Sequence, residues 1–167
     1  MSMYITLLAL HSFTRWLVLS SLVFAIFFGY HGWLLDKPYH KFDNVVRYTT
    51  ATIAHIQLVL GVWLYVISPI VSYFLHHFSI AVHERTIRFF GMEHIAMMLI
   101  GITIITIGSA KAKRKTTDRE KFKTTAIWFT VGLIVILSSV PWSFSPLISR
   151  PNFRPLLIIH PIGNLPF

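Results

Sequence analysis

The chain has 167 residues, of which 54% are hydrophobic and only 13% are charged, and its mean hydropathy is +0.64. A soluble domain carries about 25% charged residues, so this composition indicates an integral membrane protein. The absence of cysteine excludes disulfides, thiolate metal sites, iron–sulfur clusters and covalent c-type haem attachment.

Four apolar stretches are long enough to cross a bilayer, which takes ~20 helical residues. We therefore predict an all-α fold, a four-helix transmembrane bundle that runs up-down-up-down over residues 1–145. The predicted helices cover about 4–35, 46–74, 86–109 and 123–144. Residues 146–167 are rich in proline, and we expect an irregular tail on the membrane surface there.

The first two predicted helices each carry polar residues within apolar sequence. His11 and Arg15 lie four residues apart and therefore share one face of the first helix. His55 and Gln57 interrupt the second helix, and Gly61 lies near the face of His55. Polar side chains at membrane depth usually face a protein interior and mark a functional site.

The third predicted helix contains the adjacent pair Glu93 and His94 within apolar sequence. Gly101 and Gly108 follow His94 at seven and fourteen residues, close to its own face. A face without bulky side chains suits either close helix packing or a large flat cofactor that lies against the backbone.

The basic residues that give the chain its net charge of +9 lie mostly in the connections between helices. Ten basic residues fall in the connections after the first and third helices, at Lys37, Lys41, Arg47, Lys111, Lys113, Arg114, Lys115, Arg119, Lys121 and Lys123. Four fall on the other side, at Arg85, Arg88, Arg150 and Arg154. The positive-inside rule then predicts cytoplasmic loops at 36–47 and 110–123 and both termini outside. We expect the basic run to contact lipid headgroups, and we expect no nucleic acid partner.

Three intramembrane histidines on separate helices predict a polar centre. At ~1.5 Å per residue, His11 lies ~15 Å below the outer terminus and His94 ~9 Å below Arg88. His55 lies nearer the midplane. Because the first and third helices of such a bundle are diagonal and parallel, His11 and His94 can meet across its centre.

This geometry suits b-type haem between two neutral imidazoles, with Arg15 positioned to neutralise a propionate. Glu93 is the candidate catalytic residue, as an acceptor of a proton from an imidazole or a quinol. Its alternative role is an ion pair with Arg88 or Arg15.

A second hypothesis is a copper or zinc site. His11, His55, His94 and Glu93 provide suitable ligands, and Met92, Met97 and Met98 add thioethers for Cu(I). A third hypothesis is a structural subunit of a membrane complex, in which the polar groups only hold the helices together.

Several short patterns resemble small four-helix bacterial integral membrane proteins of the cytochrome b-like kind. They are HSFTRW in the first helix, HIQLVLGVWLY in the second, EHIAMM and GSAKAKRK in the third, and PW after the fourth. The resemblance covers residues about 8–145. The usual cytochrome b arrangement for two stacked haems, with two histidines on each of two helices, is absent.

The resemblance implies haem b bound by buried histidines, which here are His11, His55 and His94. It implies an electron carrier or respiratory-complex subunit in the bacterial inner (cytoplasmic) membrane. Quinone, another redox protein or a second copy of the chain are the expected partners besides the lipid bilayer.

Overall fold

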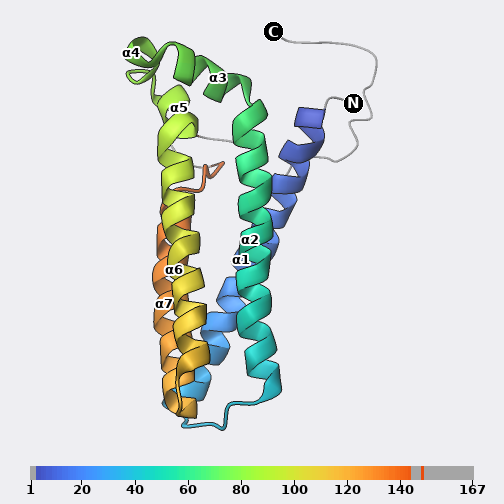
Figure 1. Cartoon of the computed structure of the whole chain (residues 1–167), viewed down its shortest axis with the longest axis vertical. Helices are drawn as coiled ribbons and strands as arrows, with labels where there is room; N and C mark the ends of the chain where they lie inside the picture. Colours follow the sequence, from blue (N-terminus) through green and yellow to red (C-terminus); the bar gives the residue numbers. More distant parts are fainter. Residues whose placement is uncertain (1–2, 144–147, 149–167) are drawn as a thin grey trace.

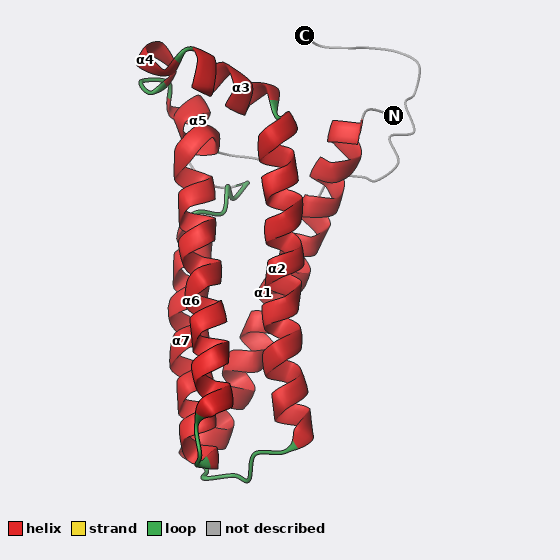
Figure 2. Cartoon of the chain, viewed as in Figure 1, coloured by secondary structure: helices red, strands yellow, loops and turns green. Residues whose placement is uncertain are grey.

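The computed structural model describes residues 3–143 and Ile148, and every regular element in them is helical (Figures 1 and 2). The elements are α1 (Met3–Leu34), α2 (Lys41–Ile67), α3 (Pro69–His76), α4 (Phe78–Ala81), α5 (Arg85–Arg88), the π-helical segment η1 (Phe89–Glu93), α6 (His94–Arg114) and α7 (Asp118–Ser138).

Four of the helical segments are long and apolar enough to cross a membrane. They are Met3–Leu34, Lys41–Ile67, Arg85–Arg114 and Asp118–Ser138. The third is continuous through α5, η1 and α6. The predicted all-α bundle is therefore confirmed, and the chain is a multi-pass membrane protein that contacts the lipid bilayer.

The four spans form a ring in which neighbours run antiparallel (Figure 1). α1 packs against α2 and α7, and α6 packs against the same two helices. α1 and α6 are consequently the diagonal pair and point the same way. Residues on these two helices at similar depth face each other across the centre of the bundle.

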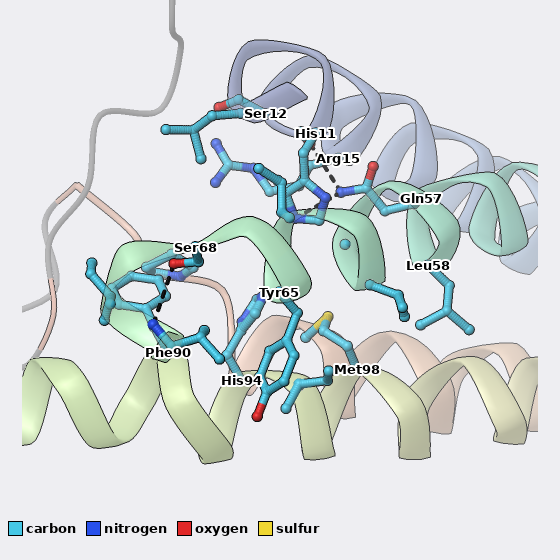
Figure 3. A pocket seen from close by; sticks show the side chains of 18 of the residues that line it. His11, Ser12, Arg15, Gln57, Leu58, Tyr65, Ser68, Phe90, His94 and Met98 are labelled. Carbon is cyan, nitrogen blue, oxygen red and sulfur yellow. Dashed lines mark hydrogen bonds between the residues drawn. The ribbon is translucent and has the colours of Figure 1, made fainter. Parts of the chain in front are cut away.

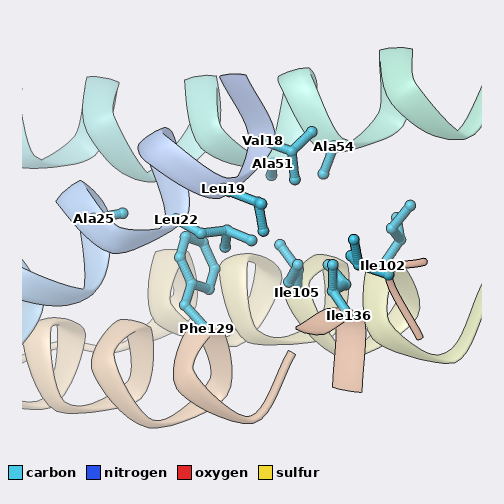
Figure 4. Packing of buried hydrophobic residues seen from close by; sticks show 11 residues of the cluster. Val18, Leu19, Leu22, Ala25, Ala51, Ala54, Ile102, Ile105, Phe129 and Ile136 are labelled. Carbon is cyan, nitrogen blue, oxygen red and sulfur yellow. The ribbon is translucent and has the colours of Figure 1, made fainter. Parts of the chain in front are cut away.

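The centre of the bundle is packed by aliphatic side chains and one large aromatic ring (Figure 4). Leu22, Ile105 and Phe129 are completely buried. α6 and α7 approach closely because glycines remove bulk at their contact: a Cβ on Gly132 would meet Ile105, and one on Gly108 would overlap Trp128. Close approach at small residues is the usual basis of helix packing in membranes.

The ends of three helices differ from the prediction. We expected one helix over 46–74, but α2 begins at Lys41, where the His40 amide donates to the Asp43 carboxylate at 2.8 Å. It ends at Ile67 because Pro69 cannot continue the ladder, and Ser68 then caps α3.

The fourth helix also differs, since it spans Asp118–Ser138 and not 123–144. Thr117 caps its start by accepting from the Glu120 amide at 3.3 Å, and Pro141 follows its end. The third span likewise extends five residues beyond its predicted end at 109, to Arg114. Apart from Ile148, the tail predicted at 146–167 lies outside the described residues.

The two basic connections lie together at one end of the bundle. Arg119 of α7 pairs with Asp36 at 3.1 Å, and the Lys121 ammonium lies 5.3 Å from the centre of the Tyr39 ring. α3, α4 and α5 lie at the opposite end (Figure 1). Charge is therefore strongly unequal between the two ends.

Candidate functional site

A cavity of about 320 Å³ opens in the bundle at the end opposite the basic connections. Its size falls within the range of small-molecule and cofactor pockets. Figure 3 shows that side chains from α1, α2 and α6 converge on it. Its polar or sulfur-bearing lining residues are Tyr4, His11, Ser12, Arg15, Gln57, Tyr65, Ser68, His94 and Met98, and the rest of the wall is mainly aliphatic.

The structure brings His11 and His94 together in this cavity. Their ring centres are 6.4 Å apart, and the ring planes lie at 75° to each other. Both side chains are partly buried, and they come from the diagonal helices α1 and α6. The two imidazoles thus approach across the bundle from opposite sides.

The environment of His94 determines which of its nitrogens is available. Nδ1 lies 2.8 Å from the carbonyl oxygen of Ser139, just beyond the end of α7. A carbonyl only accepts, so Nδ1 carries the proton and donates. In the neutral ring, Nε2 then has a free lone pair. A backbone carbonyl behind Nδ1 is the usual support of a metal-ligating histidine.

His11 is held in the opposite way, through Gln57. The Gln57 amide nitrogen donates to the His11 carbonyl oxygen at 3.0 Å and lies 3.3 Å from His11 Nε2. Its amide oxygen accepts from Thr14 Oγ1. Because an amide NH₂ only donates, His11 Nε2 accepts and Nδ1 carries the proton.

That proton on His11 has no acceptor. Nδ1 is buried and makes no hydrogen bond to any residue that the structure describes. An unsatisfied buried donor is costly, so native proteins rarely leave one without a ligand or water. Gly61 lies beside the ring: a Cβ there would be 3.2 Å from His11 Cε1. The bare backbone leaves room next to His11.

Arg15 lies one turn after His11 on α1 and also lines the cavity. Its guanidinium carbon is 5.4 Å from the centre of the Trp16 ring. The Trp16 ring in turn contacts Trp142 edge-on, at 6.3 Å between centres. The cavity therefore combines neutral imidazoles with a fixed positive charge.

The π-helical segment η1 sets the direction of His94. It widens one turn of the third span; such insertions are mostly single turns and are frequent at functional sites. The Tyr65 hydroxyl donates to the Gly91 carbonyl at 2.8 Å, and the Phe74 ring lies where a Gly91 side chain would be. The widened turn places Glu93 and His94 in different surroundings.

Glu93 does not line the cavity. Its carboxylate accepts from Arg88 Nε at 2.6 Å, and the side chains are 41% and 34% exposed respectively. The ion pair considered from the sequence is thus present, with Arg88 as the partner. Glu93 precedes His94 directly, so it stays close to the cavity but outside its wall.

His55 is separate from the other two histidines. It is exposed, and its Nε2 lies 2.8 Å from Thr106 Oγ1 on α6. Within residues 3–143 and 148, no three His, Cys, Asp or Glu side chains lie close enough to hold a metal ion. A site that uses His11, His55 and His94 together is not assembled.

Sequence reasoning missed three contributors to the cavity. The Ser139 carbonyl has no sequence signal, because any residue type has a backbone oxygen. Tyr65 was not recognised as part of the site, although its hydroxyl supports η1. Gly61 was placed near His55, whereas it lies against His11. Its small size within a bulky apolar run was the available signal.

Comparison with protein-family models, with curated proteins and with solved structures finds no match to this chain.

Proposed function

We propose that the chain is a membrane cytochrome b-like electron carrier that holds haem b between His11 and His94. One observation carries the proposal: two neutral imidazoles face each other across a cavity, and the carbonyl of Ser139 leaves His94 Nε2 free as a ligand. Haem bound by two imidazoles supplies one-electron transfer.

The dimensions of the site support this proposal. Metal–imidazole bonds are about 2 Å long, so nitrogens that share one metal lie about 4 Å apart. Rings whose centres are 6.4 Å apart can meet that spacing. The aliphatic walls suit a porphyrin face, and Arg15 suits a propionate.

His94 fits the ligand role without change, whereas His11 must give up a hydrogen bond. Gln57 now donates toward His11 Nε2. Ligation by that nitrogen replaces the amide contact, and the Gln57 amide then keeps its bond to the His11 carbonyl. Losing the bond between Gln57 and His11 Nε2 costs little stability, because a typical hydrogen bond contributes about 1 kcal/mol.

Quinol is the proposed electron donor, and Glu93 is the proposed proton acceptor. The carboxylate is partly exposed at the cavity end of the third span and precedes His94 in sequence. The Glu93 carboxylate also accepts a hydrogen bond from Arg88 Nε. The membrane is proposed to be the bacterial inner membrane, with another redox protein or a second copy of the chain as a partner.

Copper is the second candidate, because Met98 lines the same cavity as His11 and His94. Two imidazoles and a thioether form a ligand set suited to Cu(I). This set omits His55 and so departs from the three-histidine site expected from the sequence. Zinc is less well supported, since it favours four ligands.

Purification from a membrane expression host supplemented with haem precursor and copper distinguishes these candidates. Absorption spectra of the oxidised and reduced protein report haem, and elemental analysis reports iron and copper. We expect iron near one per chain and a reduced b-type spectrum. Copper without iron would favour the second candidate, and a protein with neither would support a structural role.

A further inference from the structure

The basic end of the bundle contains a second hollow, far from the His11–His94 cavity. Its lining comes from the α1–α2 connection, the start of α2, the end of α6 and the start of α7. Figure 1 shows these segments together at one end of the bundle. Its lining residues are Tyr39, His40, Lys41, Asn44, Val45, Ala112, Lys113 and Lys121. Three are lysines, and none is acidic.

The nearby carboxylates are already engaged. Asp43 accepts from the His40 amide at 2.8 Å, and Asp118 pairs with Lys121 at 3.2 Å. Lys41 and Lys113 form no ion pair with any residue in the described part of the chain. The lining therefore has an excess of positive charge.

Buried Arg47, next to the hollow, adds to this excess of positive charge. Arg47 is only 5% exposed. Its guanidinium donates to the Ser109 carbonyl at 2.8 Å and to the Asn44 amide oxygen at 2.7 Å. Its Nε is buried and unbonded among residues 3–143 and 148, and no carboxylate there forms an ion pair with it. A buried cation without an anion is costly.

Asn44 and Tyr39 connect Arg47 to the hollow. Both line it, and both interact with the Arg47 guanidinium. Burial raises the pKa of Tyr39, which outweighs the opposing effect of Arg47. The phenol is therefore protonated at neutral pH and adds a hydroxyl donor to the ammonium groups.

Apolar side chains continue from the hollow along α2. Phe42, Val45 and Tyr48 are between 44% and 54% exposed, beside Lys41 and Asn44. In a membrane, such side chains contact acyl chains just below the headgroups. The hollow thus combines donors for an anion with an adjoining surface for hydrocarbon.

We propose that this hollow binds the phosphate of an anionic lipid headgroup, whose acyl chains lie along the exposed side chains of α2. Lys41 and Lys113 contact the phosphate, and the buried positive charge of Arg47 attracts it electrostatically. Basic pockets between transmembrane helices recognise anionic headgroups in this way. This site is independent of the cofactor proposed at the other end.

The test compares two double variants with the same charge change at the same end of the bundle. Lys41→Gln with Lys113→Gln alters the hollow. Lys115→Gln with Lys123→Gln is the control, because both lysines are exposed and neither lines the hollow. The full chain is placed in nanodiscs of phosphatidylcholine with increasing phosphatidylglycerol, and its thermal midpoint is measured.

We expect phosphatidylglycerol to raise the midpoint of the wild type and of the control. For the Lys41–Lys113 variant, the half-saturating phosphatidylglycerol fraction should increase about tenfold or more. An equal increase of the half-saturating phosphatidylglycerol fraction in the two variants would overturn the proposal, since general surface charge would then explain the effect. If inorganic phosphate raised the thermal midpoint in pure phosphatidylcholine as much as phosphatidylglycerol does, the assignment to a lipid would be overturned.

Discussion

His11 and His94 face each other but use their ring nitrogens differently. His94 donates from Nδ1 to a backbone carbonyl and keeps Nε2 free, whereas Nε2 of His11 accepts from Gln57. His94 is therefore prearranged as a ligand, and His11 is restrained by a side chain that can move. The two residues contribute unequally to any centre formed between them.

This difference predicts a hierarchy among the histidine variants. His94→Ala should remove the reduced b-type spectrum, because it deletes the prearranged ligand. His55→Ala is the control and should retain the wild-type haem-to-protein ratio, because His55 is exposed and its hydrogen bond goes to Thr106, away from the cavity. Absorption spectra of both purified proteins provide the measurement. Haem lost from His55→Ala but kept in His94→Ala would exclude the pairing.

Glu93 provides a second prediction for a single residue. Glu93→Gln removes the proton acceptor, so it should slow reduction by quinol at least tenfold and leave the haem spectrum unchanged. Stability should change by less than about 1 kcal/mol, since the Arg88 pair is partly exposed. Stopped-flow reduction with a soluble quinol reports the rate. An unchanged rate would reduce Glu93 to an ion-pair residue.

The sequence located the polar residues but not the faces of their helices. In a soluble helix, an apolar stripe marks the buried side. In a membrane, lipid and protein interior are both apolar, so the pattern does not distinguish them. For this reason His55 was counted among the buried histidines, although it is exposed and His11 lies in the cavity.

Helix spans were predictable because a bilayer sets their length, while some of their ends were not. The start of α2 at Lys41 lies within a polar segment that reads as a loop, and a local bond between His40 and Asp43 extends the helix into it. The π-helical turn at Phe89–Glu93 has no sequence pattern of its own. It depends on tertiary contacts from Tyr65 and Phe74.

Two glycines with different roles give a prediction about helix packing. A Gly108→Leu side chain would collide with Trp128 between α6 and α7, so it should destabilise the bundle by about 1–3 kcal/mol. Gly61→Leu should instead extend into the cavity beside His11, exclude haem and leave the bundle folded. Thermal unfolding in detergent and the haem content of both variants are the readouts. Equal loss of stability in the two variants would contradict these separate roles.

The whole molecule has two dissimilar ends. One holds both basic connections, linked by the Arg119–Asp36 pair, and the other holds the cavity and the short helices α3 to α5. A protein with this polarity has a preferred orientation in a membrane. We expect the basic end in the cytoplasm and the cavity near the outer surface.

Cysteine labelling tests this orientation. Thr116→Cys reports the basic end and spares Thr117, whose side chain caps α7. Ser79→Cys in α4 reports the other end. A membrane-impermeant maleimide added to intact cells should label Ser79→Cys and should reach Thr116→Cys only after lysis. The reverse pattern would invert the molecule and move the cavity to the cytoplasmic half.

Near-infrared magnetic circular dichroism of the oxidised, purified protein is the most direct test of haem ligation by His11 and His94, because it reports the axial ligands of haem iron. The proposal predicts the low-spin signal of two neutral imidazoles in the wild type, and loss of that signal in both His11→Ala and His94→Ala. A wild-type protein without haem, or a bis-imidazole signal that persists in either variant, would contradict it.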